Sequence, residues 1–394
     1  MKKLFKIFIF LFIATCLSPT KDIRAYSNFI AFGYSSCITC HYNALGNGPL
    51  NDYGRSVSAT GIAARALYSD KKSEEELSDE SSFFLGKFKD NKWLRPSLNI
   101  RGLRYDKNIF LSSRTASHIP MQAEANLVLR PLSNDKFFLV GTYGYAPTPQ
   151  SSRNTNKKVS NVISREHYLQ YTIAKGHRLY LGFMDKAYGL RIPDHTAYSR
   201  MNTTNGQNDQ SHGVIYHYTQ KNYELAFNAF MGNMYQDAPL RQQGFAINAE
   251  YEIVDDFRLG LTSLYSKNKY VNYFINGLTA RSGFDNGASI IAEFGAISTK
   301  PLLTTNPSTL GVYSMTQAML KLTRGVHFLT SYEYFKSDIS SGNLNSNYRY
   351  IMGLQVIPAQ RIELRFDLVN SRIVSSSTVY PDSWNFMSQV HLWF

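Results

Sequence analysis

The chain has 394 residues, of which 43% are apolar and 14% aromatic, and its 42 Lys and Arg against 29 Asp and Glu give a formal charge of +13. So many aromatic residues, with only 18% charged residues, exclude intrinsic disorder, and three Cys are too few for a disulfide scaffold. After the N-terminal segment there is no uninterrupted apolar run of about 20 residues, which excludes a polytopic helical membrane protein. A transmembrane β-barrel remains possible, because only alternate residues of its strands face lipid.

The first 25 residues have the features of an export signal. Three Lys within Met1–Lys6 precede the apolar run Ile7–Leu17, and Ile23-Arg24-Ala25 offers a small-residue cleavage site. The apolar run is too short to span a bilayer, so we expect residues 1–25 to be removed. Lipidation at Cys16 is the alternative, although the threonine before it departs from the usual small residue. In either case the protein leaves the cytoplasm, which makes nucleic acid a poor candidate partner.

A haem-attachment motif follows the signal. Cys37-Ile-Thr-Cys40-His41 matches C-x-x-C-H, in which two thiols about one helical turn apart bond the haem vinyl groups and the histidine ligates iron. A thioredoxin-like redox pair would need a βαβ context, and a zinc knuckle would need further Cys or His nearby. A disulfide between Cys37 and Cys40 would close a small strained loop. The motif therefore predicts covalently bound haem c, with His41 as an axial iron ligand.

The expected haem segment, residues 26–69, is too small to form its own core. It combines a Gly/Asn-rich turn with a helical stretch that reaches about Leu67. Arg55 is a candidate partner for a haem propionate, because Arg pairs with carboxylates, and it is as readily a solvated side chain. No further His occurs before residue 118, so the first candidates for a sixth iron ligand are His118 and Met121.

A charged linker, residues 70–92, is expected to form a tether or a short polar helix. In residues 93–394 apolar or aromatic residues recur at every second position, which is the period of strands with one apolar face. In the segment from Tyr223 to Met231, for example, Glu224 and Asn228 fall on the face expected to line an interior. The pattern predicts an all-β fold, a transmembrane antiparallel outer-membrane β-barrel with a small N-terminal α/irregular haem segment.

The requirement for an even number of strands decides the expected strand count. Fifteen segments alternate well, and barrels of this kind have an even number of strands, so the weak segment 270–280 is counted as a strand. We expect about 16 strands, with 14 as the next choice, and a long outer loop at 298–312. The predicted strands are 95–105, 119–130, 136–146, 164–173, 177–184, 212–219, 222–232, 242–252, 257–267, 270–280, 287–297, 313–323, 325–336, 347–357, 360–370 and 384–394.

Short turns alternate with longer polar loops, as in outer-membrane barrels whose short turns face the periplasm. The longest loop, 185–211, is expected to be able to fold inward as a constriction. The chain ends Val390-His-Leu-Trp-Phe394, and a terminal Phe after alternating apolar residues resembles the assembly signal of bacterial outer-membrane proteins.

An export signal, one C-x-x-C-H at Cys37, Cys40 and His41, and a barrel ending in Phe394 together resemble the fused outer-membrane cytochrome–porins. That resemblance implies a haem segment in the barrel mouth. It also implies electron transfer between an extracellular donor or acceptor, such as iron, and a periplasmic carrier such as a cytochrome. An extracellular iron oxidoreductase is one form of this activity, and no hydrolase or transferase motif appears. The alternative function is a solute-conducting porin whose haem is a structural plug or redox sensor.

Overall fold

The computed structural model describes residues 36–67, 72–83, 85–88, 90–132, 136–145, 162–284, 286–342, 345–375, 378 and 380–394. The expected signal peptide, Cys16 and most of the expected loop 147–163 lie outside these residues. The helical elements are η1 (Cys37–Thr39), α3 (Asp52–Val57), the π-helical η2 (Ser58–Ile62), α4 (Glu74–Glu80), α5 (Tyr198–Met201) and η3 (Ala238–Leu240). No helix among the described residues is long and apolar enough to cross a membrane.

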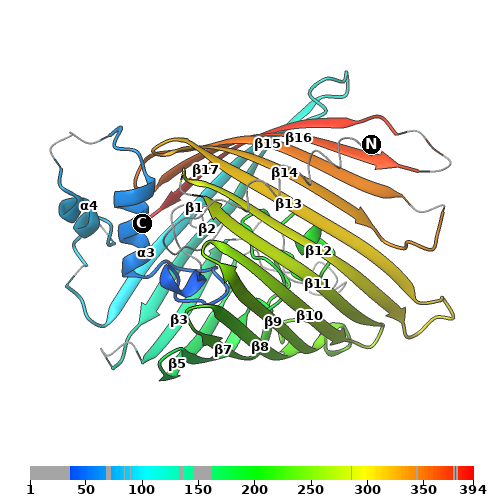
Figure 1. The fold of residues 1–394 in the computed structure, drawn as a ribbon, viewed down its shortest axis with the longest axis horizontal. Helices are drawn as coiled ribbons and strands as arrows, with labels where there is room; N and C mark the ends of the chain where they lie inside the picture. Colours follow the sequence, from blue (N-terminus) through cyan, green and yellow to red (C-terminus); the bar gives the residue numbers. More distant parts are fainter. Residues whose placement is uncertain are drawn as a thin grey trace.

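The strands form one closed antiparallel sheet (Figure 1). They are β1 (Leu94–Lys107), β2 (Thr115–Leu129), β3 (Phe137–Tyr145), β4 (Val162–Ile163), β5 (His167–Ala174), β6 (His177–Met184), β7 (Ser211–Thr219), β8 (Tyr223–Gly232), β9 (Gln243–Val254), β10 (Phe257–Lys267), β11 (Val271–Phe284), β12 (Ala288–Pro301), β13 (Thr309–Thr323), β14 (Val326–Lys336), β15 (Ser346–Ala359), β16 (Ile362–Val374) and β17 (Ser383–Trp393). Strands that are neighbours in chain order pair, except that β4 and β5 both pair with β3, and β17 pairs with β1.

The count of 16 barrel strands is confirmed, because β4 and β5 are two parts of one strand. Both pair with β3, β4 through Gly144 and Tyr145 and β5 through residues 137–141. Glu166 lies in the interruption between them, where Thr142 N donates to its carbonyl oxygen (2.8 Å) and Thr142 Oγ1 accepts from its backbone N–H (2.9 Å). The interruption therefore keeps the two strands linked while it aims a carboxylate at the interior.

Several strand boundaries differ from the sequence prediction. The weak segment 270–280, counted as a strand, is confirmed as β11, which pairs with β12 along its whole length and with β10 from Asn272 to Ser282. The expected long loop 298–312 is wrong, because β12 continues to Pro301 and β13 begins at Thr309, where it pairs with Thr299. Ser and Thr end these strands and carry no apolar alternation, but their backbone groups still complete the hydrogen-bond ladder.

The predicted inward and outward faces are confirmed. In β8, the residues at alternate positions Ala226, Asn228 and Phe230 are buried, whereas Phe227, Ala229 and Met231 between them are exposed. Exposed aromatic side chains lie near both ends of the strands, as in membrane-interface girdles. Examples are Tyr223 and Tyr251, which pair across β8 and β9 at one end, and Tyr143, Phe274 and Tyr350 at the other.

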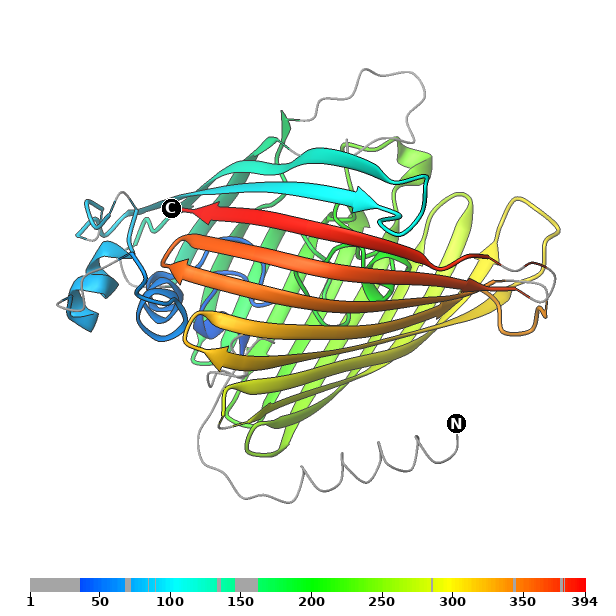
Figure 2. The same ribbon diagram turned by 90° about the horizontal axis from the view of Figure 1, so that it is seen from above.

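The two rims of the barrel differ. One, here called the turn rim, carries short turns such as 175–176, 255–256 and 324–325 together with the first and last strand ends. The other, the loop rim, carries the longer connections. Residues 36–67, here called the plug, enter the barrel through the turn rim, and α3 and α4 lie there beside the C-terminus (Figures 1 and 2).

The charged linker forms helix α4 at the turn rim. Ser73 and Glu76 make a capping box, in which the Ser73 hydroxyl accepts from Glu76 N and the Glu76 carboxylate accepts from Ser73 N. Ser78 hydrogen-bonds to Ser56 of α3 (2.7 Å), and Arg361, between β15 and β16, donates to backbone carbonyls at the end of α4. The linker is thus tied to both the plug and the barrel.

The outward position of Leu261, midway along β10, gives a test of the assigned faces. Its side chain is 64% exposed, so Leu261→Arg places a charge at mid-membrane height and is expected to destabilise the barrel by about 2–4 kcal/mol. Leu261→Ala, the control, loses apolar area without adding charge and is expected to cost less. Denaturant titration in lipid vesicles measures both, and equal losses of stability would contradict the outward assignment.

Candidate functional site

The C-x-x-C-H motif forms a tight turn within the plug. Cys37 to Thr39 make the single 3-10 turn η1, and the backbone N–H of His41 donates to the carbonyl of Cys37 (3.0 Å). His41 then pairs with Leu50 in an antiparallel bridge that closes the Gly/Asn-rich loop. The two thiols are therefore presented about one helical turn apart, and neither Cys37 nor Cys40 is in a disulfide.

Residues after the motif hold this turn in place. Asn51 caps α3 by accepting from Gly54 N (2.8 Å), and its side-chain amide donates to the carbonyls of Ile38 (3.3 Å) and Thr39 (3.0 Å). Gly54 lies so close to the motif that an added Cβ would be 2.3 Å from the Cys40 carbonyl oxygen. These contacts give the run from Asn51 to Gly54 a physical role in positioning the cysteines.

The plug packs on the inward face of the barrel wall. Tyr42 and Ala44 join a buried apolar cluster with side chains of six strands, and the Tyr42 ring meets the Phe138 ring edge-on at 5.2 Å. At the turn rim, Ala64 N donates to the Ile357 carbonyl (2.8 Å). The wall members of the cluster are Val128, Phe138, Val140, Tyr168, Tyr180, Ile215 and Ala226, joined by Met184 at the end of β6.

Ion pairs also fasten the plug near the turn rim. The Arg95 guanidinium, which is buried, donates to both carboxylate oxygens of Asp52 at 2.7–3.0 Å. Arg324 donates to the Ala63 carbonyl (2.8 Å). Bidentate pairing of this kind is stronger and more specific in geometry than a single hydrogen bond.

The predicted inward fold of loop 185–211 is confirmed for residues 185–210, here called the inward loop. The loop folds back into the barrel and is held by polar side chains of the wall: Leu190 N donates to Glu293 (2.7 Å), and Tyr198 N donates to Glu333 (2.7 Å). Arg349 of β15 pairs with Asp194 of the loop (2.7 Å). The loop therefore crosses the interior as a fixed element.

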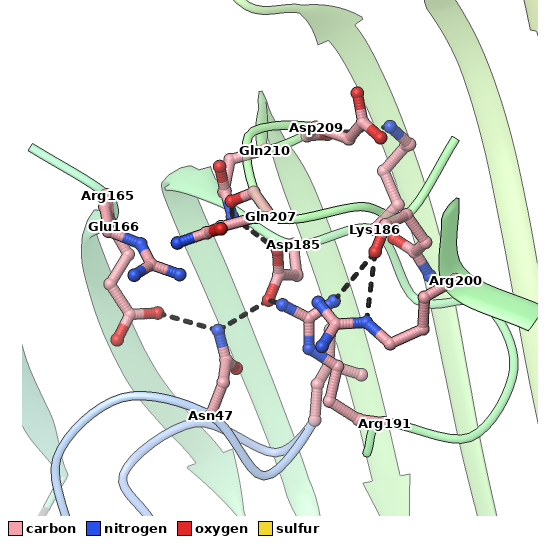
Figure 3. A network of polar contacts seen from close by, with 12 residues as sticks. Asn47, Arg165, Glu166, Asp185, Lys186, Arg191, Arg200, Gln207, Asp209 and Gln210 are labelled. Carbon is pink, nitrogen blue, oxygen red and sulfur yellow. Dashed lines mark hydrogen bonds and ion pairs between the residues drawn. The ribbon is translucent and has the colours of Figure 1, made fainter. Parts of the chain in front are cut away.

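The plug and the inward loop meet at Asn47 (Figure 3). Its side-chain amide donates to Asp185 of the loop (2.7 Å) and to Glu166 of the wall (3.2 Å). Asp185 also accepts from Gln210 (2.9 Å) and pairs with Arg191. Asn43 is a second donor to Glu166 (3.2 Å). A network of buried polar groups thus joins plug, wall and loop in mid-barrel.

Cys37 lines a small, partly open cavity of about 60 Å³ between the plug, the inward loop and the wall. This volume is well below the roughly 300–1,000 Å³ of sites that hold small molecules and cofactors, so the three parts are closely packed here. The walls combine apolar side chains with cations, and they also include a histidine and two carboxylates. The lining residues are Ala44, Leu45, Lys186, Tyr188, Gly189, Leu190, Arg191, His217, Glu224, Ala226, Asn248, Glu250, Arg281 and Ile291.

Burial sets the protonation states of the motif. It raises the pKa of the Cys37 thiol to about 11, although the Arg281 guanidinium beside it acts in the opposite direction, and it raises the pKa of Cys40 to about 12. Burial lowers the pKa of His41 to about 4, partly offset by backbone hydrogen bonds at Gly48 and Asn47. His41 is thus a neutral imidazole at ordinary pH, which is the form that ligates metal.

The structure places the other sequence candidates as follows. Arg55 is buried in α3, where its Nη2 donates to the Pro96 carbonyl (3.3 Å) and its Nη1 has no hydrogen-bond partner among the described residues. His118 is exposed on the half of β2 nearer the loop rim, paired with Arg104, and Met121 lies in the same part of β2, at a register shift. The cavity beside Cys37 is lined instead by strands β7, β8, β9, β11 and β12 together with the plug and inward loop.

Sequence reasoning did not single out the wall residues of this cavity. His217, Glu224 and Arg281 are far from the motif in sequence, and only barrel closure brings them to it. The available signal was their position on the polar face of alternating strands. Among the described residues no group of three or more His, Cys, Asp and Glu side chains is arranged to hold a metal ion.

No protein-family model and no curated protein matches the sequence. Solved structures match the fold. A loop L8 deletion mutant of OmpT, an outer membrane protein of Vibrio cholerae, aligns with a TM-score of 0.60 at 11% identity over 76% of this chain and 99% of that chain. The outer membrane channel DcaP of Acinetobacter baumannii gives 0.57 at 10% identity over 76% and 97%. An anion-selective porin from Comamonas acidovorans gives 0.56 at 9% over 76% and 99%.

These likenesses define the fold as a 16-stranded barrel of the outer-membrane porin type. At such low identities the fold is established, and the activity has to be argued from the residues of this chain.

Asn47 provides a test of the contact between plug and inward loop. Asn47→Ala removes a donor from two buried carboxylates, Glu166 and Asp185, which is expected to destabilise the docked plug by about 1–3 kcal/mol. Hydrogen exchange of residues 43–50 should accelerate accordingly. The exposed loop residue Asn306→Ala is the control and should leave exchange unchanged. Unaltered exchange in Asn47→Ala would show that the network does not hold the plug.

Proposed function

We propose that this protein lies in the bacterial outer membrane and carries one covalent haem c on the plug, through which electrons cross between the cell exterior and the periplasm. The observation that carries the proposal is the position of Cys37-Ile-Thr-Cys40-His41 inside a porin-type barrel. A haem-attachment motif on a soluble domain would need no such enclosure.

The donor set fits a covalent haem, because two thiols outside any disulfide stand one turn apart and a neutral histidine follows them. The cavity that Cys37 lines, about 60 Å³, is smaller than a haem, so attachment would require the plug to pack less closely against the inward loop and the wall. Cationic side chains suited to propionates line that cavity, among them Arg191 and Arg281, and Arg55 keeps a buried Nη1 without a partner among the described residues. When bound, haem c supplies one-electron transfer at iron.

The protein contributes to electron transfer by holding the haem motif partway across the membrane, inside the barrel. A hydrocarbon layer of about 30 Å is too thick for a single tunnelling step, so a redox centre must lie partway across. The plug holds its motif inside the wall, docked at the turn rim through Asp52 and Arg95 and at mid-barrel through Asn47. The partners on this proposal are a periplasmic electron carrier at the turn rim and an extracellular donor or acceptor, such as iron, at the loop rim.

A solute-conducting porin is the second candidate. The similar solved structures favour it, because they are those of an outer membrane protein, an outer membrane channel and an anion-selective porin. The haem would then act as a structural plug or redox sensor. The network that joins plug and inward loop favours the first function, because two segments rather than one occupy the interior.

Covalent haem is the first expected result. Protein purified from outer membranes of a host that matures c-type cytochromes should keep haem on a denaturing gel. Cys37→Ser combined with Cys40→Ser should remove all of it, because no thiol is left to form a thioether. Ser36→Ala, the neighbouring control, should keep full haem. Covalent haem in the double variant, or none in the unchanged protein, would refute the attachment.

Electron transfer is tested in vesicles that contain the protein and enclose a ferric cytochrome, with ferrous iron added outside. The unchanged protein should reduce the enclosed cytochrome, and the variant lacking Cys37 and Cys40 should reduce it at the rate of empty vesicles. Equal rates for the two proteins would contradict haem-dependent transfer. Planar-bilayer recording separates the second candidate: a wide, persistent ion current through the haem-loaded protein would favour the solute porin.

A further inference from the structure

The membrane-facing wall of β1, β2 and β3 carries an open groove of about 760 Å³. Its floor is low at Ala125 and Gly141, and a Cβ added at Gly141 would meet nothing within 4 Å. Leu127 and Tyr143, which also line it, are 41% and 62% exposed and alternate with the inward-facing residues of their strands. No plug residue is among the described residues that line the groove, so it opens outward, toward lipid.

The outward face of β1 and β2 continues from this groove toward the loop rim. Leu98 of β1 lines the groove, and six residues further along β1 Arg104 stands opposite His118 of β2. Six residues of a strand tilted by about 45° span about 14 Å of membrane depth, close to half of a hydrocarbon layer of about 30 Å. The distance from the groove to Arg104 therefore corresponds to one leaflet. The outward pairs between them are uncharged: Ile100 with Ala123 and Gly102 with Pro120.

Two arginines and one aspartate, here called the rim cluster, stand at the outer end of this face. Asp106, which is 3% exposed, accepts from Arg104 Nε (2.9 Å) and Nη2 (3.3 Å) and from Arg114 Nη2 (3.1 Å). The two arginine side chains stay 49% and 56% exposed. A guanidinium has five N–H donors, so both arginines keep donors for a further anion, and two cations face only one carboxylate.

The rim cluster lies at the membrane interface. Asp106 pairs with Phe386 of β17, and two residues away along β17 the Trp384 ring meets the Phe110 ring edge-on, with centroids 5.9 Å apart. Aromatic side chains gather in this way at the boundary between membrane and water. Because the longer loops of such barrels face the cell exterior, the cluster lies at the level of the headgroups of the outer leaflet.

We propose that the groove and the rim cluster together bind one phosphorylated lipid of the outer leaflet. Arg104 and Arg114, which Asp106 orients, hold the phosphate, and the exposed His118 ring is a further donor. An acyl chain lies in the groove over Gly141. Arginine matches phosphate oxygens in charge and in bidentate geometry, and lipid chains surround the wall in which the groove lies. The site is on the outside of the barrel, so it does not depend on haem.

Arg372 of β16 provides a matched control. It lies on the outward face near the loop rim, is 59% exposed and pairs with a single aspartate, Asp382, at 3.7 Å. One cation faces one carboxylate there, and neither residue lines the groove. Loss of any arginine at the rim can therefore be distinguished from loss of the proposed site.

Native mass spectrometry in a neutral detergent measures the binding, with phosphatidic acid as the phosphorylated probe and zwitterionic phosphatidylcholine as the reference. The unchanged protein should retain one phosphatidic acid in preference to phosphatidylcholine by about tenfold or more. Arg104→Gln combined with Arg114→Gln should abolish this preference, and Arg372→Gln should keep it. Gly141→Leu fills the groove, so it should weaken retention of long-chain phosphatidic acid but not of a short-chain form.

A free anion is the other source of phosphate, and competition separates it from a lipid. A large excess of inorganic phosphate should leave the long-chain lipid bound, because the groove holds the acyl chain. Displacement by inorganic phosphate, or full retention of the long-chain lipid in Gly141→Leu, overturns the lipid site.

The arginine variants test the phosphate end of the site. No preference in the unchanged protein, an undiminished preference in the double variant, or an equal loss in Arg372→Gln overturns the assignment. Where the double variant fails to fold, Arg114→Gln provides the test, because it leaves Arg104 paired with Asp106. A weaker preference in this variant supports the site, and an unchanged preference overturns it.

Discussion

Closure of the strand sheet is the constraint on which the rest of the structure depends. A backbone that faces lipid finds no water to satisfy its N–H and C=O groups, so every strand needs a neighbour on both sides. The terminal residue completes this ring, because Phe394 and Leu98 exchange backbone hydrogen bonds of 2.9 and 3.0 Å. Closure of the sheet creates the barrel interior. It also brings residues of β7, β8 and β11 to the cavity that Cys37 lines, because these strands surround the plug only when the wall is closed.

The interior is polar and charged, and its charges are matched locally. Arg349 pairs with Glu333 and Asp194, and Arg258 pairs with Glu252. Because each buried charge costs free energy unless it is paired, these contacts stabilise the inward loop and the plug only as complete sets. The same requirement explains why Asn47, a neutral donor, stands between the two carboxylates of Glu166 and Asp185.

Much of the fold could be predicted from the sequence, because a strand's two faces alternate residue by residue. The strand number and the inward set around Asn228 came from that alternation. It failed at 298–312, where Ser and Thr extend β12 and β13 without an apolar signal. The motif of Cys37, Cys40 and His41 could be recognised from the sequence, because its residues lie within five consecutive positions. The surroundings of Cys37 could not be predicted, because only the position of β7 around the closed barrel brings His217 to the cavity that Cys37 lines.

The burial of the motif has a consequence for the order of biogenesis. In the closed barrel Cys40 is buried and Cys37 is half-buried, and burial raises the pKa of both thiols, so both are protonated at ordinary pH. The plug precedes β1 in the chain. On the proposed function, haem would therefore be attached while residues 36–67 are still exposed, before β17 pairs with β1. Cytochrome maturation would thus be an upstream checkpoint for insertion of the barrel into the membrane.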